Sequence, residues 1–328
     1  MSTGFLAKVK TVAKELIGIS IRYSGIPFII RNTYARNKVT IIVYHDPKPE
    51  ILDKHLRYLS RRYSYITLDN LMNAIYSKHW DDIPPKSMII TFDDGHKGNF
   101  ELLEVLKKHK VTPTIYVSSQ LMNTNRHFWF MEKDIDSRHY KRLGNSVRLH
   151  ALNKEIAFSP SKEFPDHERQ ALNEKEIMSM KNFVSFQSHS ASHPVLTACT
   201  YDESKEEIFR SKADIETMIG DDCKHFAYPN GDYSEREIVL LKEAGYISGR
   251  TIDLGWNDLN TDPFRLKISG VSDGASINWV AAQLSGVPIY IQYLFEGSLN
   301  GRYPSIKFEG DRSHGKAANE FQTAAREF

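Results

Sequence analysis

Residues 88–95 read Met88-Ile89-Ile90-Thr91-Phe92-Asp93-Asp94-Gly95, an apolar run that ends in two adjacent carboxylates and a glycine. The run predicts a strand at 87–92 that is buried on both faces, because strands of parallel sheets are continuously apolar. Gly95 predicts a turn at the carboxyl end of this strand. Active sites in barrels of parallel strands gather at that end, so Asp93 and Asp94 are candidates for chemistry. An Asx-turn that caps a following helix is the alternative, and it is favoured on this stretch alone.

Further strands and helices alternate on both sides of this run. Runs rich in β-branched and aromatic residues predict strands at 39–44, 114–117, 184–187, 225–228 and 246–250. Capping boxes at Asn173, Thr200 and Ser234 mark helix starts, and Gly245 marks a helix end. The alternation predicts an α/β fold with parallel strands and helical crossovers. Residues 123–166 show no clear period and predict an irregular insertion over one end of a barrel.

Two histidines follow another predicted strand, in Ser188-His189-Ser190-Ala191-Ser192-His193-Pro194. On one helical turn, a spacing of four residues brings both rings to the same face, which suits two ligands of one metal. Without further partners, the pair is better explained as solvated side chains of a helix. Combined with a strand-end carboxylate, it makes an open three-ligand site that leaves room for water, as catalytic zinc requires.

A third stretch, Phe226-Ala227-Tyr228-Pro229-Asn230-Gly231, ends a strand and by itself predicts only a turn. In this order, the three stretches resemble the polysaccharide deacetylase family, which is the NodB-homology domain of carbohydrate esterase family four. The resemblance covers about residues 39–286. It implies a distorted (β/α) barrel of the NodB-homology type and a metal-dependent carbohydrate N-deacetylase.

The resemblance also assigns the site residues. It implies that Asp94, His189 and His193 bind one divalent metal and that Asp93 is the general base. It implies that Tyr228 and Pro229 contact the substrate, with Tyr228 beside the floor that binds the acetyl group. Zinc suits this nitrogen and oxygen ligand set best, and cobalt, nickel, manganese and iron stay open as alternatives.

The chain departs from the family pattern in two places. Many members have an arginine in the third motif that pairs with the base, whereas this chain has Ala227 there, so the environment of Asp93 lacks an explanation. Many members also supply a general-acid histidine from a late strand. This chain has no histidine between His225 and His314.

A replacement for that acid stands at the end of the first predicted strand, in Tyr44-His45-Asp46. This motif is similar to the circularly permuted branch of the family that includes the poly-N-acetylglucosamine deacetylases. The resemblance implies His45 as the general acid, and Asp46 could orient its ring through a hydrogen bond, as carboxylates beside site histidines do. The alternative is a strand-end histidine that is bound to the backbone.

The substrate implied by the resemblance is an N-acetylated amino sugar, either within a polysaccharide or in a lipid-linked or nucleotide-linked glycan precursor. A backbone N–H near Tyr228 would then help the metal to stabilise the oxyanion. Three alternatives stay open. These are a deformylase or other N-deacylase that acts on a lipid-linked amino sugar, a catalytically silent sugar-binding protein, and a membrane-recruitment module.

The charge of the chain is concentrated at its beginning. Residues 1–38 contain seven Lys and Arg and one Glu, a net charge of +6, although the whole chain has only +2. A nucleic-acid binder would spread positive charge over its working domain, so we expect no nucleic-acid partner and favour peripheral contact with an anionic membrane leaflet. Apolar residues recur there at helical spacing, as in an interfacial helix, although a helix that packs on the barrel fits equally well. These residues are Leu6, Val9, Ala13, Leu16 and Ile17.

We therefore predict a basic amphipathic leader at 1–38, a barrel at 39–300 and a polar tail at 301–328. No window approaches the roughly 20 apolar residues of a membrane-spanning helix, and the leader lacks the pattern of a signal peptide. Cys199 and Cys223 lie in unlike contexts and are predicted to be reduced thiols. The expected location is the cytoplasm, at the inner face of the membrane, in the assembly of cell-surface polysaccharide.

Overall fold

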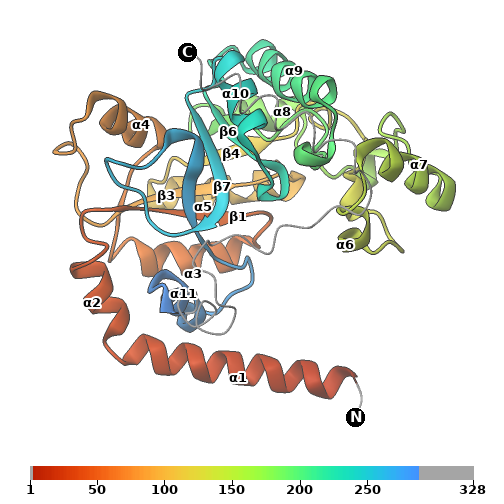
Figure 1. The fold of residues 1–328 in the computed structure, drawn as a ribbon. Helices are drawn as coiled ribbons and strands as arrows, with labels where there is room; N and C mark the ends of the chain where they lie inside the picture. The colour runs from red at the N-terminus through yellow and green to blue at the C-terminus, as the bar shows by residue number, and fades with distance from the viewer. Residues whose placement is uncertain (1–2, 288–328) are drawn as a thin grey trace.

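The computed structural model describes residues 3–287 and shows a barrel of parallel strands surrounded by helices (Figure 1). β1 (Val39–Tyr44) pairs in parallel with β3 (Ser87–Phe92) and with β8 (Leu266–Gly270). The strands between β8 and β3 complete the ring, and they are β7 (Ser248–Leu254), β6 (His225–Ala227), β5 (Ser185–Ser188) and β4 (Thr114–Val117). β2 (Ser64–Tyr65) pairs with the beginning of β3. The predicted distorted (β/α) barrel is confirmed, with seven strands of the described chain in the closed ring.

The sequence predicts six of the eight strands in the described chain. The bounds predicted for β1, β3 and β4 agree with the structure residue for residue, and those for β5, β6 and β7 differ by one to four residues. β2 has only two residues, and β8 carries exposed Lys267 in its middle. Neither strand has an apolar run long enough to be recognised in the sequence.

The strands are apolar throughout because both of their faces are covered. Val39, Ile41 and Val43 pack in one hydrophobic cluster with side chains of α4 (Leu68–Ser77). Ile42 and Tyr44 pack in a second, larger cluster with α3 (Pro49–Leu59). Since alternate side chains of a strand point to opposite faces, β1 contributes to both clusters, and all six of its residues are buried.

Helices cover the outside of the barrel, and three of them begin at the predicted capping boxes. The capping residues are Asn173 of α8 (Glu174–Met180), Thr200 of α9 (Tyr201–Ile219) and Ser234 of α10 (Glu235–Glu243). Gly245, with φ +82°, follows the end of α10 as predicted. The other elements of the barrel are α5 (Leu103–His109), α11 (Ile277–Leu284) and the short 3-10 helices η1 (Lys97–Leu102), η3 (Asp166–Glu168), η4 (Leu196–Ala198), η5 (Pro229–Gly231) and η6 (Pro263–Arg265).

The insertion predicted at 123–166 is more regular than its sequence indicates. It contains the 12-residue helix α7 (Asn145–Ile156) and the short helices η2 (Trp129–Met131) and α6 (Ser137–Tyr140). These helices pack around a small cluster of Trp129, Tyr140, Leu152, Phe158 and Val195. The indole nitrogen of Trp129 donates to the carbonyl of His193 at 2.9 Å. The insertion therefore packs at the carboxyl end of β5, and its helices depend on this packing rather than on a helical pattern of their own.

The N-terminal helix α1 (Thr3–Tyr23) lies beside α11 and leads into α2 (Ile26–Asn32) (Figure 1). The carboxylate of Glu15 accepts hydrogen bonds from Ser276 and Asn278, and Arg22 donates to Asn278 at 2.7 Å. A Cβ atom at Gly18 would lie 3.1 Å from the backbone of Asn278, so the glycine permits the close approach of the two helices. Of the two alternatives for the N-terminal segment, the structure thus shows the helix that packs on the rest of the protein.

The other face of α1 and α2 carries exposed apolar side chains, which are Val12, Leu16, Ile17, Ile19 and Tyr23 of α1 and Ile26, Phe28 and Ile29 of α2. None of the helices in the described chain combines the length and the apolar character needed to cross a bilayer. The tail predicted at 301–328 lies outside the described residues.

Candidate active site and metal centre

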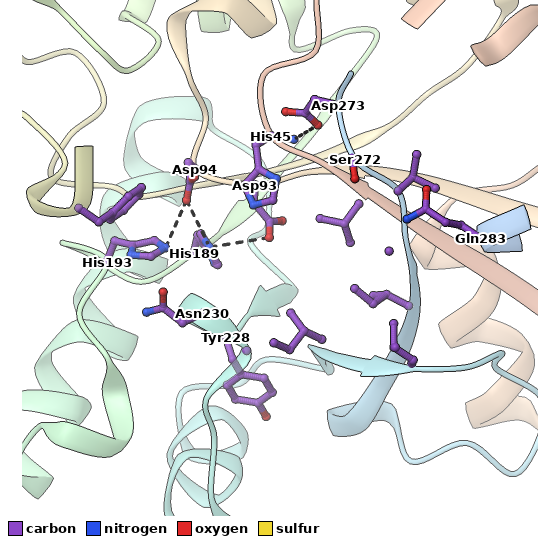
Figure 2. A pocket seen from close by; sticks show the side chains of 18 of the residues that line it. His45, Asp93, Asp94, His189, His193, Tyr228, Asn230, Ser272, Asp273 and Gln283 are labelled. Carbon is purple, nitrogen blue, oxygen red and sulfur yellow. Dashed lines mark hydrogen bonds and ion pairs between the residues drawn. The ribbon is translucent and has the colours of Figure 1, made fainter. Parts of the chain in front are cut away.

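The carboxyl ends of β3 and β5 bring together the three predicted metal ligands. Ligand atoms of Asp94, His189 and His193 all lie within 4.8 Å of one another, and all three residues are buried. Oδ1 of Asp94 lies 3.5 Å from Nε2 of His189 and 3.2 Å from Nε2 of His193 (Figure 2). One carboxylate oxygen and two imidazole nitrogens thus converge on one point.

The hydrogen bonding around these ligands fits a divalent metal. Oδ1 of Asp94 is buried and has no hydrogen-bond partner in the described chain. Nδ1 of His189 pairs with the carbonyl of Ala227 at 2.8 Å, which directs Nε2 of this ring toward Asp94. A hydrogen bond from the other ring nitrogen fixes the tautomer of a ligating histidine. Nitrogen and carboxylate ligands suit zinc and its first-row neighbours.

The electrostatics of the site favour the protonation states that a metal requires. Burial alone would raise the pKa of Asp94, but the neighbouring imidazoles of His193 and His96 hold it well below its usual range. Burial lowers the pKa of His189 to about 4. An ionised carboxylate and a neutral imidazole are the forms that bind metal, so neither ligand has to lose a proton near neutral pH.

The chain reaches this geometry through a left-handed turn after β3. Asp94 has φ +70° and Gly95 has φ +72°, and a Cβ atom at Gly95 would lie 2.6 Å from the side chain of Val117. The N–H of Asp93 donates to the carbonyl of Tyr44 at 2.9 Å, which continues the pairing between β3 and β1. The next helix, η1, begins after His96 without any side-chain cap. The Asx-turn alternative for the two aspartates is therefore not observed.

The two histidines meet for a different reason from the one predicted. Residues 189–195 form no helical turn, and Ser190 and His193 have positive φ values of 66° and 57°. The carboxylate of Glu207, on α9, accepts hydrogen bonds from the N–H groups of Ala191 and Ser192 at 2.9 and 2.8 Å. The predicted helical turn is wrong, and a tight loop held by Glu207 brings the two imidazole rings together instead.

The predicted base, Asp93, is paired with an arginine from β7. Nη2 of Arg250 lies 2.5 Å from both carboxylate oxygens of Asp93, and Arg250 is completely buried. Oδ2 of Asp93 lies 4.0 Å from Nε2 of His189, so the carboxylate borders the metal site. Arg250 therefore stands in for the arginine that is missing from the third motif and explains how a second buried carboxylate is tolerated beside Asp94.

A further histidine, His96, supports the metal ligand Asp94. Nε2 of His96 lies 3.1 Å from Oδ2 of Asp94, the oxygen that does not face His193. Burial alone would lower the pKa of His96, but the carboxylates of Asp94 and Asp46 raise it. Nε2 of His96 is placed to donate a hydrogen bond to this carboxylate oxygen, so His96 holds Asp94 in one orientation.

We expect His96→Ala to weaken zinc binding by about 10-fold to 100-fold, the usual effect of removing a side chain that hydrogen-bonds to a metal ligand. Zinc affinity is measured by competition with a chromogenic chelator. His96→Gln retains an N–H donor and should lose less affinity than the alanine variant. Equal affinity of the parent protein and His96→Ala would show that Asp94 needs no such support.

The predicted acid, His45, lines the same cleft from the end of β1 (Figure 2). The N–H groups of His45 and Asp46 donate to the carboxylate of Asp273 at 3.0 and 2.8 Å, and Asn99 donates to the carbonyl of His45 at 2.7 Å. The imidazole of His45 has no hydrogen bond within the described chain, so the backbone-bound alternative is not observed. Asp46 points toward Gly98 and forms no hydrogen bond with the ring of His45 among the described residues. Its predicted orienting role is not supported.

Tyr228, Asn230 and Gly231 of the third motif line the cleft, but the tyrosine hydroxyl is bound elsewhere. The Tyr228 hydroxyl donates to the carbonyl of Phe264 at 3.1 Å, and the Tyr228 N–H donates to the carbonyl of Arg250 at 3.1 Å. The Tyr228 N–H is thus already engaged and cannot serve the oxyanion in this geometry. Pro229 is buried and does not line the cleft, whereas Asn230 does. Contacts of Tyr228 and Pro229 with substrate stay predictions.

The functional residues that the sequence does not reveal come mostly from distant segments. Arg250 ends a predicted strand, and an arginine within a buried strand is a signal that could identify a partner for a carboxylate. Asp273 and His96 belong to no recognisable sequence motif. Lys141, from the insertion, also lines the cleft, and burial lowers its pKa.

Comparison with known proteins agrees with this geometry. A profile of the family described as polysaccharide deacetylase matches residues 81–248. The protein YxkH of Bacillus subtilis (strain 168), whose own assignment as a polysaccharide deacetylase is provisional, is 23% identical over 250 residues, which cover 73% of each chain.

Two solved structures share the fold. The Streptococcus pyogenes deacetylase PplD in complex with acetate superposes with a TM-score of 0.56 at 17% identity, covering 75% of this chain and 98% of that one. IcaB from Ammonifex degensii superposes with a TM-score of 0.53 at 16% identity, covering 76% of this chain and 97% of that one. At these identities, the superpositions establish the fold of the chain.

Proposed function

Because the chain belongs to the polysaccharide deacetylase family, we propose that it is a metal-dependent hydrolase that removes the N-acetyl group of an amino sugar. The sugar would be part of a polysaccharide or of a lipid-linked or nucleotide-linked glycan precursor. The observation that carries the proposal is the buried triad of Asp94, His189 and His193 beside the paired carboxylate of Asp93. These residues line one cleft of about 710 Å³, which is large enough for a small ligand.

The residues divide the reaction between them. When bound by the triad, a divalent metal would supply a Lewis acid for the acetyl carbonyl and make a water molecule more acidic. Asp93 accepts a proton from the water as it attacks the carbonyl, and Arg250 keeps this carboxylate in place. His45, at the end of the neighbouring strand β1, gives a proton to the departing amine, which is a poor leaving group without it.

Removal of the metal tests this proposal directly. We expect the purified protein to bind one zinc ion, to release acetate from N-acetylhexosamine polymers or precursors, and to lose this activity after dialysis against a chelator. Added zinc should restore it. His193→Ala should bind zinc much more weakly and remain inactive, because a buried ligand is lost. The proposal fails if the chelator-treated protein is as active as the untreated one, and release of formate instead of acetate would change the acyl group.

We also propose that α1 and α2 contact an anionic bilayer. Their exposed face carries eight large apolar side chains, and basic residues such as Arg31 lie beside them. Apolar side chains enter the interface of a bilayer while basic residues attract anionic lipid headgroups. This charge pattern complements an anionic leaflet, which supports the membrane as the partner of the exposed face.

The prediction is that the full-length protein cosediments with vesicles of phosphatidylcholine and phosphatidylglycerol, and less with phosphatidylcholine alone. Leu16→Asp/Ile19→Asp should reduce binding by about tenfold or more, because two apolar anchors are replaced by negative charge. Val239→Asp is the matched control, since Val239 is an exposed aliphatic residue on α10. Equal sedimentation of the double variant and the parent would contradict the proposal.

A further inference from the structure

The cleft extends well beyond the metal triad. Beyond His45, it continues past the ends of β1, β7 and β8 to α11 and α1. Figure 2 shows Ser272 and Gln283 on the opposite side of His45 from Asp94 and His193. We call this extension the aliphatic arm after five aliphatic side chains that line it, which are Val43, Ile252, Leu254, Ile268 and Val271. Polar side chains, among them Lys14, Asp273 and Gln283, line it as well.

From this arm we infer that the substrate is a glycolipid, an N-acetylated amino sugar joined through an anionic linker to an aliphatic chain. The inference rests on the proposed deacetylase function and selects one of its substrate classes. The sugar occupies the metal end of the cleft, and the chain leaves through the aliphatic arm.

The lining of the arm suits hydrocarbon better than sugar. Hydroxyl groups lose hydrogen bonds to water when they enter a site, so a sugar needs polar partners there. The five aliphatic side chains offer none, whereas burial of each methylene group of a chain against them is stabilising. Ile252 and Leu254 are only partly buried in the structure, so a chain in the arm would cover apolar surface that is now open.

The charges of the cleft favour an anionic linker. The ammonium group of Lys14 lies 4.7 Å from the ring centroid of Trp279, and it has no ion pair with any carboxylate of the described chain. Lys141 lines the cleft near the metal ligands, where the charges of Asp232 and Asp94 attract it without a direct ion pair among the described residues. Of the carboxylates in the cleft, Asp93 pairs with Arg250, Asp94 belongs to the metal triad, and Asp273 accepts two main-chain N–H groups. Two cations therefore line the cleft without a direct ion pair in the described chain, as expected for a site that binds an anion.

The arm also contains a polar group that lacks a partner. Oε1 of Gln283 is buried and accepts no hydrogen bond from the described residues. A buried acceptor in this state is costly unless a ligand or water pairs with it. Gln283 stands on α11 and lines the cleft, where a hydroxyl group or a water molecule beside the linker would donate to this acceptor, since the anionic linker itself carries only acceptors.

The helix that closes the arm is the one that we propose to contact the bilayer. Lys14 reaches the cleft from α1, which Glu15 and Arg22 fasten to α11. The opposite side of α1 carries exposed Leu16 and Ile19. A chain that leaves the arm along α1 therefore approaches the apolar face of the same helix.

Soluble analogues test the arm without a membrane. Methyl and octyl glycosides of N-acetylglucosamine, N-acetylgalactosamine and N-acetylmannosamine are compared below their micelle concentrations, each with and without a phosphodiester at the anomeric carbon. We expect kcat/KM for acetate release to be about tenfold or more higher for octyl than for methyl glycosides, and higher again with the phosphodiester. Calorimetric titration of Asp93→Asn protein should give the same order of affinities without turnover.

Matched variants test separately the preference for the octyl chain and the preference for the phosphodiester. Leu254→Ser should lower the octyl-to-methyl ratio, and Lys14→Gln should lower the gain from the phosphodiester. Val239→Ser and Lys175→Gln change an exposed aliphatic residue and an exposed lysine outside the cleft, so both ratios should stay as in the parent. Lys14 is exposed, so its variant stays informative even if Leu254→Ser folds poorly.

The outcomes separate this inference from the function on which it rests. Equal kcat/KM for octyl and methyl glycosides, or a preference for polymer or for nucleotide-linked sugar, would overturn the glycolipid while leaving the deacetylase intact. No acetate release from any glycoside, polymer or precursor would overturn the proposed function and the inference with it.

Discussion

Asp93→Asn is expected to lower kcat for acetate release by about 10²-fold to 10⁴-fold, the usual contribution of a general base, while one zinc ion stays bound. The asparagine amide cannot accept the proton of the attacking water. Its oxygen still accepts a hydrogen bond from Arg250, so the buried arginine keeps a partner. Zinc content is measured by mass spectrometry of the metal, and acetate release by a coupled assay.

Asp94→Asn is the matched control for this experiment. It changes the neighbouring carboxylate, which belongs to the triad, and should lose zinc together with activity. The two variants therefore separate the base from the ligand. An Asp93→Asn protein that deacetylates as fast as the parent would show that Asp93 is not the base.

Arg250→Met is expected to lower the free energy of unfolding by about 3–5 kcal/mol, because it leaves the carboxylate of Asp93 buried without its partner. Methionine occupies a similar volume and is apolar, so the main effect is electrostatic. Combining Arg250→Met with Asp93→Asn removes both charges, and the double variant should be more stable than Arg250→Met alone. Urea denaturation followed by circular dichroism gives the free energies for this double-mutant cycle.

The comparison depends on the coupling between the two positions rather than on either single value. If the effects of the two substitutions simply add, Arg250 and Asp93 do not stabilise one another, and the arginine has another purpose. Zinc should be removed before denaturation, since metal binding also stabilises the folded state. The same Arg250→Met protein should show lower kcat, because its base is no longer held in place.

Local patterns in the sequence determined most of the strands, three helix starts and the candidates for the main site residues. The run at 88–92 is continuously apolar because β3 is covered on both faces, and three capping boxes mark their helices because the caps are local hydrogen bonds. The strand ends then locate Asp93, Asp94 and the histidine pair at one face of the barrel. Each of these features depends on neighbours within a few residues, which is the range that a sequence pattern records.

The N-terminal segment shows how an ambiguous pattern is decided. The sequence fits an interfacial helix and a packed helix equally well, and the structure shows that one face of α1 packs on α11 through Glu15 and Gly18. Apolar residues such as Leu16 remain exposed on the other face. Partners more than 250 residues away decided between the alternatives, and helical spacing contains no information about them.

Tertiary structure alone decided how the site is assembled. It brought Arg250 to Asp93 across 157 residues, replaced the expected helical turn between His189 and His193 by a loop held by Glu207, and carried Lys14 into the cleft. These contacts follow from the closure of the barrel and the packing of helices on it. A buried charge needs a partner in space, and the chain can supply it from any segment, so the sequence by itself showed which residues are chemically capable and only the fold determined which of them meet.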